Sequence, residues 1–169
     1  MSRGFVKEGD QEEPVVIPPR AALPPGATNY VTPNGLSQLQ EEKDSLLAQL
    51  KAMDGSDERE LRRKRTMING KLQGVSERLA SARVLRPEEQ PQDEVRFGAT
   101  VAYRVAPNAQ SVTITIVGVD EADVQQRKIA FVAPLAKALT GAKVGDTVKF
   151  KLGDETRDLE VLDISYAKS

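Results

Sequence analysis

The side chains of this protein that could do chemistry are carboxylates and hydroxyls, because its 169 residues include neither His nor Cys. This composition excludes thiolate zinc sites, cysteine nucleophiles and every catalytic dyad or triad built on imidazole. Carboxylates form two short clusters, Asp54, Asp57 and Glu58 in the first and Asp120, Glu121 and Asp123 in the second. Oxygen ligands suit Mg²⁺, but helix capping explains the first cluster and turn formation the second more simply. We expect the chain alone to hold no metal and no cofactor.

Basic residues gather directly after the first acidic cluster. Residues 57–86 hold nine Lys or Arg against four Asp or Glu, in a chain whose net charge is -1. The densest part, here called the basic cluster, consists of Arg59, Arg62, Arg63, Lys64 and Arg65. A run of charge usually marks a solvated helix face, and the functional alternative is a contact with nucleic acid or an acidic channel wall. Arg65 falls on an apolar stripe, so we expect its aliphatic stem to lie along a partner helix.

Both clusters belong to a predicted helical hairpin at residues 32–86. Thr32 can cap a first helix that begins with Pro33, where the missing N–H costs nothing. Gly55 can end this helix in the left-handed conformation, and Ser56 or Asp57 can cap the second, Asp57 having capping-box spacing to Glu60. Two such helices joined by about four residues are expected to fold back antiparallel as a coiled-coil hairpin.

Apolar stripes with alternating three- and four-residue spacing define the expected contact between the two helices. The stripes consist of Leu36, Leu39, Leu46, Leu50 and Met53 in the first helix, and of Leu61, Ile68, Leu72, Val75, Leu79 and Ala82 in the second. Gly70 and Gly74 lower the helix propensity of the second helix by about 1 kcal/mol each, yet the stripe continues through them. The pairing of the stripes therefore has to stabilise the helix.

Composition changes on either side of the hairpin. Residues 1–31 contain five of the ten prolines and no hydrophobic period, which predicts an extended, disordered arm, with docking of the short apolar run at residues 15–17 as the alternative. Pro87 and Pro91 lie at a linker, residues 87–94. From residue 95 the apolar residues alternate as in strands, and residues 134–139 have the spacing of one short helix. Residues 95–169 are therefore predicted to form a small antiparallel sheet with a helix across it, which makes the chain α+β.

Composition also limits the partners. No apolar run approaches the ~18 residues of a membrane-spanning helix and no signal-peptide core is present, so we expect a cytoplasmic protein with no membrane partner. Aromatic residues make up 4% of the chain, without Trp, and are too sparse to build stacking platforms for single-stranded nucleic acid.

Three motifs of the C-terminal part, in order and with matching spacing, resemble the Gre transcript-cleavage factors of bacterial RNA polymerase, GreA and GreB. The motifs are VRFGATV at residues 95–101, IVGVDEAD at 116–123, and PLAKAL followed by KVGD within 134–146. Upstream, YVTPNG at residues 30–35 is similar to the start of the family's coiled coil. The resemblance implies an FKBP-like C-terminal domain that docks on the polymerase and a hairpin that enters its secondary channel.

The resemblance also implies which residues meet the partner. The docking residues would be Asp120, Glu121, Asp123, Ala133, Pro134 and Lys137. Arg59, Arg62, Arg63 and Lys64 would contact nucleic acid or the channel wall. RNA polymerase would be the partner, nucleic acid would be met only within the transcription complex, and we expect the chain itself to be a monomer.

The hairpin tip departs from the family's pattern. Cleaving Gre factors carry a DLSENAEY tip whose Asp and Glu help to hold a second Mg²⁺ in the polymerase active site. Here residues 53–60 read MDGSDERE, and each helix is roughly two turns, or ~10 Å, shorter than in the family. A carboxylate that stops ~10 Å away cannot coordinate a metal at about 2.1 Å. We therefore expect a regulator that is not an enzyme and acts mainly by occupying the channel, with weak or no stimulation of cleavage.

Alternative functions stay open at this point. Asp54, Asp57 and Glu58 could assist Mg²⁺ in a true cleavage stimulator if the hairpin seats more deeply than in its relatives. The chain could instead resemble the short-coiled-coil nucleoside diphosphate kinase regulators, or be a structural coiled-coil adaptor. A prolyl isomerase is disfavoured, because residues 95–169 contain only five aromatic residues to line an apolar pocket.

Overall fold

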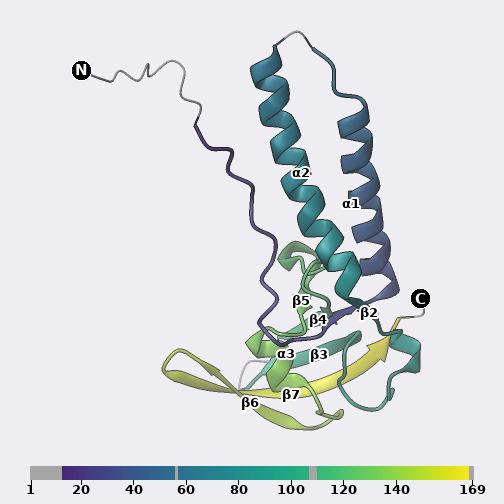
Figure 1. The fold of residues 1–169 in the computed structure, drawn as a ribbon. Coiled ribbons are helices and arrows are strands. Elements are labelled where there is room, and N and C mark those ends of the chain that lie inside the picture. Colours follow the sequence, from purple (N-terminus) through teal and green to yellow (C-terminus); the bar gives the residue numbers. More distant parts are fainter. Residues whose placement is uncertain (1–12, 56, 107–109, 168–169) are drawn as a thin grey trace.

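The structure is a computed structural model that describes residues 13–167, apart from residue 56 and residues 107–109. Two helices, α1 (Pro33–Lys51) and α2 (Glu58–Ser81), form an antiparallel hairpin that projects from a domain built on a five-stranded sheet (Figure 1). At 1.5 Å per residue these helices are about 28 and 36 Å long. The chain is α+β, as predicted.

Local sequence sets the ends of the two helices. The Thr32 hydroxyl accepts a hydrogen bond from the Gly35 N–H at 2.9 Å, and Pro33 occupies the first helical position. The end of α1 differs from the prediction, because the helix stops at Lys51 and Gly55 lies beyond it in the tip loop with φ 148°. This φ is outside the left-handed helical region, so Gly55 shapes the loop and does not cap the helix.

The apolar stripes of the two helices meet as predicted. Four side chains between the helices are buried, and Val31 closes the base of the hairpin. They are Leu39, Leu46, Ile68 and Val75, with Leu36, Leu50, Met53, Leu72, Leu79 and Ala82 partly buried around them. Arg65, the basic residue of the stripe, is exposed as a whole residue, so its guanidinium keeps its hydration.

The arm differs from the expectation of a free, disordered segment. Residues 13–23 are extended, as the prolines favour, and lie against the hairpin, and residues 24–27 form a turn closed by the Ala27 N–H on the Pro24 carbonyl at 3.0 Å. Residues 29–31 form a strand, β1 (Asn29–Val31), which pairs in parallel with β2 (Ala82–Val84) at the base of the hairpin. The expectation for residues 1–12 lies outside the described residues.

The C-terminal domain contains the strands of the larger sheet. These are β3 (Ala99–Val105), β4 (Ser111–Val117), β5 (Lys128–Ala130), β6 (Thr147–Leu152) and β7 (Glu155–Tyr166), in the spatial order β5-β4-β3-β7-β6. The prediction of an antiparallel sheet holds for β4-β3-β7-β6, but β5 pairs in parallel with β4. Residues 118–127 include the short 3-10 helix η3 (Val124–Gln126) and return the chain along the sheet before β5 begins. The sheet is therefore mixed.

A continuous core joins this sheet to α3 (Pro134–Leu139), the predicted short helix. The buried residues are Val95, Ala99, Val101, Tyr103, Ile114, Ile116, Ala136, Leu139, Ala142, Leu159 and Val161. The linker before the sheet is also structured. It contains the 3-10 helix η2 (Pro87–Glu89), and Glu94 forms an isolated bridge with Lys143.

Candidate functional site

The acidic residues of the hairpin tip lie at the end of the hairpin that is far from the sheet (Figure 1). Asp54 accepts a hydrogen bond from the Gly55 N–H at 2.8 Å, and Asp57 accepts from the N–H groups of Arg59 and Glu60 at 3.1 and 3.2 Å. Asp57, one of the two predicted candidates, therefore caps α2. Glu58 is exposed in the first turn of α2. Within the described residues, no three carboxylates lie close enough together to hold a metal ion.

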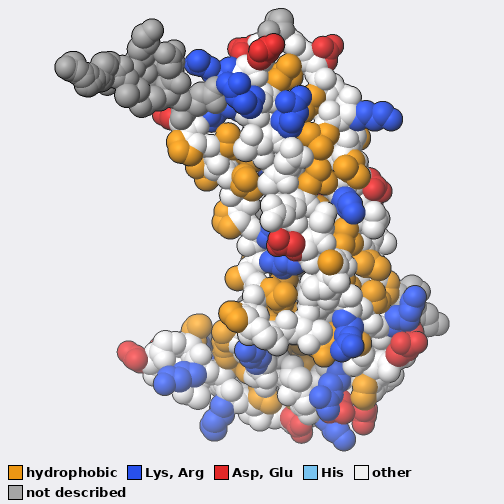
Figure 2. Space-filling view, in the orientation of Figure 1, with side chains coloured by type: hydrophobic (Ala, Val, Ile, Leu, Met, Phe, Trp, Pro, Cys, Tyr) orange, Lys and Arg blue, Asp and Glu red, His pale blue; other side chains and the backbone are white. Residues whose placement is uncertain are grey.

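The basic cluster covers the hairpin just below these acids, and Lys and Arg side chains gather there in Figure 2. Arg59, Arg62 and Lys64 are exposed, whereas Arg63 is half-buried and donates to the carbonyl oxygen of Glu13 at 2.5 Å. Lys64 also pairs with Glu60 at 3.2 Å, and both side chains are more than half exposed. Because exposed pairs of this kind contribute little free energy, Lys64 can exchange Glu60 for another anion.

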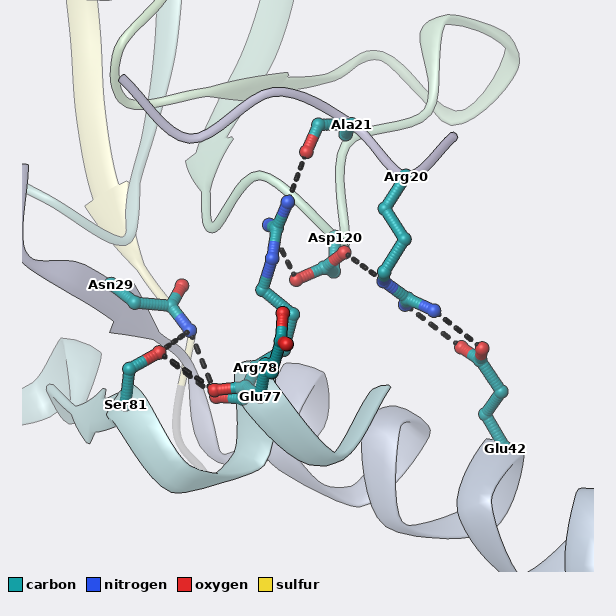
Figure 3. Close-up of polar contacts among 8 residues, drawn as sticks. All are labelled: Arg20, Ala21, Asn29, Glu42, Glu77, Arg78, Ser81 and Asp120. Carbon is teal, nitrogen blue, oxygen red and sulfur yellow. Dashed lines mark hydrogen bonds and ion pairs between the residues drawn. The ribbon is translucent and has the colours of Figure 1, made fainter. Parts of the chain in front are cut away.

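Two of the implied docking residues lie inside the molecule, at the junction between hairpin and sheet domain. Glu121 is 8% exposed and accepts hydrogen bonds from the Thr32 hydroxyl at 2.5 Å and the Asn34 amide at 2.9 Å. The carboxylate of Asp120 lies between the guanidinium groups of Arg20 and Arg78, at 3.1 and 3.0 Å (Figure 3). Both carboxylates hold the hairpin on the domain, which differs from the docking role that the resemblance implied.

The third acid of this group is also engaged within the chain. Asp123 is half-buried, and its carboxylate accepts a hydrogen bond from the Gln125 N–H at 3.0 Å and thereby caps η3. This is the turn role expected for a short acidic cluster. Of the three acids, none presents a carboxylate that is free of hydrogen bonds within the described chain.

The remaining docking candidates lie together at the start of α3. Pro134 and Lys137 are exposed and Ala133 is half-buried. Beside them the rings of Tyr30, Phe97 and Phe131 form a cluster with centroids 5.5 to 6.0 Å apart. These rings, with Lys137 and Arg96, line a hollow of about 460 Å³. An apolar hollow with a cationic rim is suited to a protein partner.

Arg20 is a junction residue that the sequence did not reveal. Its guanidinium forms a bidentate pair with Glu42 of α1, at 2.6 and 2.9 Å, in addition to its contact with Asp120 (Figure 3). The hydrogen bonds lower the pKa of Glu42 and raise the pKa of Arg20. Nothing in the spacing of the arm points to these partners, because they are 22 and 100 residues away along the chain.

Asn29 is a second junction residue that the sequence did not reveal. Its side-chain amide donates to the carbonyl oxygen of Arg78 at 3.0 Å and to the Ser81 hydroxyl at 3.2 Å (Figure 3). The last carbonyl groups of a helix have no partner within the helix, so Asn29 satisfies one at the end of α2.

Among the helices that the structure describes, none is long and apolar enough to cross a membrane.

The sequence of this chain is similar to those of known transcription elongation factors. The family model "Transcription elongation factor, GreA/GreB, C-term" matches residues 90–166. GreA of Thermodesulfovibrio yellowstonii is 32% identical over 151 residues, which covers 80% of this chain and 96% of that protein. GreB of Neisseria meningitidis is 33% identical over 156 residues, covering 83% of this chain and 95% of that protein.

Other matches are partial or remote. GreA of Pelobacter propionicus is 38% identical over 99 residues, and this alignment covers 59% of the chain and 63% of that protein. A solved GreA/GreB factor from Nitrosomonas europaea is 22% identical, with a TM-score of 0.41 and coverage of 83% of this chain and 99% of that one. The family assignment rests on the Thermodesulfovibrio and Neisseria proteins, which are each more than 30% identical to this chain and are aligned over 96% and 95% of their own length. The chain belongs to the GreA/GreB family of transcription elongation factors.

Proposed function

We propose that this protein binds RNA polymerase in the bacterial cytoplasm and regulates elongation by placing its hairpin in the secondary channel. The observation that carries the proposal is the separation of two surfaces. The basic cluster lies near the free end of the hairpin, and the aromatic hollow beside α3 lies on the sheet domain. A protein that anchors on an outer surface and reaches inward requires this separation. In this proposal nucleic acid is met only within the transcription complex, and the protein acts as a monomer.

The docking surface in this proposal is the region of Ala133, Pro134 and Lys137 together with the aromatic hollow. Its rings are already packed on one another, so docking would cost little side-chain entropy. Lys137 and Arg96 give the rim a positive charge that would suit an acidic surface of the polymerase. Asp120 and Glu121 have no part in it, because their carboxylates are used at the junction.

The hairpin would act by occupying the channel and would contribute little metal chemistry. Asp54 and Asp57 already accept backbone hydrogen bonds. The helices are also short, since α1 has 19 residues and α2 has 24. Metal coordination fails beyond a few tenths of an ångström, whereas the field of the basic cluster extends over about 8 Å at physiological ionic strength.

Stimulation of transcript cleavage is the second candidate. Its support is that all three tip acids are exposed and carry the oxygen ligands that Mg²⁺ prefers. A polymerase halted in a backtracked complex separates the two mechanisms. The complex is incubated with the protein and Mg²⁺, and the RNA lengths are then read on a gel with and without nucleotides.

We expect weak or no shortening of the RNA and a change in its rate of extension. Asp54→Asn with Asp57→Asn and Glu58→Gln should leave that change nearly intact, whereas Arg62, Arg63 and Lys64 replaced by Glu should abolish it. Replacing the exposed cations Lys149, Lys151 and Arg157 by Glu is the matched control, because it makes the same change in charge away from the hairpin. Strong Mg²⁺-dependent cleavage that the Asn/Gln variant loses would show that the protein works as a cleavage stimulator.

A further inference from the structure

The N-terminal arm connects the hairpin to the sheet domain at Arg20. The Nη1 and Nη2 atoms of Arg20 donate to the two carboxylate oxygens of Glu42 in α1, at 2.6 and 2.9 Å. Its Nε atom donates to Asp120, in the loop that follows β4, at 3.1 Å (Figure 3). Arg20 therefore joins the helical hairpin to the sheet domain, and these three residues are here called the clamp.

The clamp uses the fixed geometry of a guanidinium group. Three N–H donors in one plane meet two carboxylates from different elements, and Arg78 of α2 donates to the second oxygen of Asp120 at 3.0 Å. The side chains of Arg20 and Asp120 are 23% and 9% exposed, so their contact is partly shielded from solvent. Arg20→Lys would keep the charge, but a single ammonium group cannot hold both carboxylates in this arrangement.

Two glycines of α2 let the arm come close enough to make this contact. A Cβ atom at Gly74 would lie 3.2 Å from Cδ of Arg20, and one at Gly70 would lie 2.0 Å from Cδ1 of Ile17. Gly70 and Gly74 are one helical turn apart, so they share one face of the helix. The aliphatic stem of Arg20 therefore passes over α2, while its guanidinium group pairs with α1.

The position of the clamp along the hairpin suits it to control an angle. The contacts of Glu121 with Thr32 and Asn34 lie at the first turn of α1. Glu42 lies further from the base, about 14 Å along the helix axis from Pro33. A contact at the very base of a rod resists its rotation weakly, whereas a contact further along resists it strongly. A rotation of about 10° at the base would move the far end of α1, about 28 Å away, by about 5 Å.

We propose that Arg20 is a positioning residue, which fixes the angle between the hairpin and the sheet domain and so aims the hairpin tip. This inference rests on the proposed function, because the aim matters only once the sheet domain is anchored on the polymerase. The surface around Lys137 and the aromatic hollow sets the place of docking, and the clamp sets the direction in which the tip then points. A hairpin that samples many angles enters the channel only from the fraction of molecules that are aimed at it.

The angle is measured in the full chain without polymerase. The chain has no Cys, so Ala48→Cys in α1 and Ser165→Cys in β7, both at exposed positions, supply two sites for spin labels. Double electron–electron resonance then gives the distribution of distances between the two labels. In Arg20→Lys and in Glu42→Gln this distribution should widen by about 4 Å, which corresponds to a rotation of about 10°. Arg157→Lys, the same change in an exposed pair of the sheet domain, is the matched control and should leave the width unchanged.

The effect on transcription is measured with the same substitutions in the unlabelled chain, at a saturating concentration. Affinity for the polymerase is measured separately, by competition with the labelled unmodified chain. Arg20→Lys should reduce the change in RNA extension rate about threefold, because only the aimed fraction of molecules occupies the channel. Its affinity should change by less than about twofold, because the docking surface is intact. A role limited to stability would not separate these two readouts, and melting temperatures show that each variant is folded in the assay.

Each outcome decides a different part of the proposal. Unchanged distance distributions in Arg20→Lys and Glu42→Gln would show that Arg20 does not hold the angle. Wider distributions with an unaltered effect on RNA extension would overturn the positioning role. Wider distributions in a chain that does not bind the polymerase would refute the proposed function and the aiming of the tip with it, although they would support the clamp itself.

Discussion

The sheet domain buries its apolar side chains more completely than the hairpin does. The sheet domain buries one continuous core between β3, β4, β7 and α3, in which Leu139 and Val101 are 0% exposed. In the hairpin only Val75 reaches that level, and most of the stripe is half-buried. Two helices without a third layer leave most of each helix in contact with solvent.

This difference explains why the hairpin needs support from outside itself. Its base is tied by Glu121, Asp120 and the β1–β2 pair, and one of its faces is covered by the described part of the N-terminal arm. The sheet domain is stabilised by its own core. The stability of the hairpin, in contrast, depends on polar contacts at its base. Four measurements test this contrast, and they are ordered here from the largest expected effect to the smallest.

The core of the sheet domain should be the most sensitive to truncation. Leu139→Ala removes a fully buried side chain from between α3 and the sheet and should cost about 3–5 kcal/mol in the free energy of unfolding. Urea denaturation followed by circular dichroism measures this loss. A cost below that of the hairpin substitutions described next would show that the sheet domain is not the better packed part.

Truncations in the hairpin should cost less. Leu46→Ala, at a position 5% exposed, should cost about 2–4 kcal/mol, and Leu72→Ala, at a half-buried position, should be at the lower end of that range. The matched controls are Gln40→Ala and Gln73→Ala, which lie on exposed positions of the same helices and should change stability by less than about 0.5 kcal/mol. Equal, small losses at all four sites would contradict the pairing of the stripes.

Loss of the Glu121 contacts at the junction should have the third-largest effect on the free energy of unfolding. Glu121→Ala leaves the Thr32 hydroxyl and the Asn34 amide without their carboxylate partner and should cost about 1–3 kcal/mol. Hydrogen exchange should report the loss as faster exchange in the first turn of α1, because Thr32 caps that helix. Glu160→Ala, which breaks the more exposed pair with Arg104, is the control. Unchanged exchange in α1 would argue against a role for Glu121 in supporting the hairpin.

The smallest effect is a dependence on pH from the pair of Glu42 with Arg20. The pKa of Glu42 is lowered in the fold from its ordinary value of 4.5, so its stabilisation is present above that value and disappears as pH falls through the folded pKa. Because the pair is partly exposed and screened by solvent, its contribution should be below about 1 kcal/mol.

The melting temperatures of the unmodified chain and of Glu42→Gln, measured between pH 7 and pH 3, test this linkage. The unmodified chain should be the more stable at pH 7, and the difference should shrink below pH 4.5. Arg157→Gln with Glu155→Gln removes an exposed pair outside the junction and serves as the control. A constant difference across this range would mean that the charge of Glu42 does not stabilise the contact between the arm and α1.

The sequence alone determined the elements whose signals are local. Thr32 and Pro33 at the start of α1, Asp57 before α2, the apolar stripes and the span of α3 could be predicted, because capping, spacing and periodicity act within a few residues. The resemblance of residues 95–146 to the GreA/GreB family also depended only on residue order, and the nearly full-length relatives confirm the family.

Tertiary structure decided the contacts between residues far apart in the chain. It placed Asp120 and Glu121 at the junction, paired β5 in parallel with β4, and laid the arm along α2. Gly70 and Gly74 show the limit of local reasoning most clearly. Within the helix these glycines only lower its stability. In the folded protein, Ile17 and Arg20 occupy the space that the missing side chains leave. The fit between the arm and α2 depends on both segments, so it cannot be predicted from the spacing of residues in one of them.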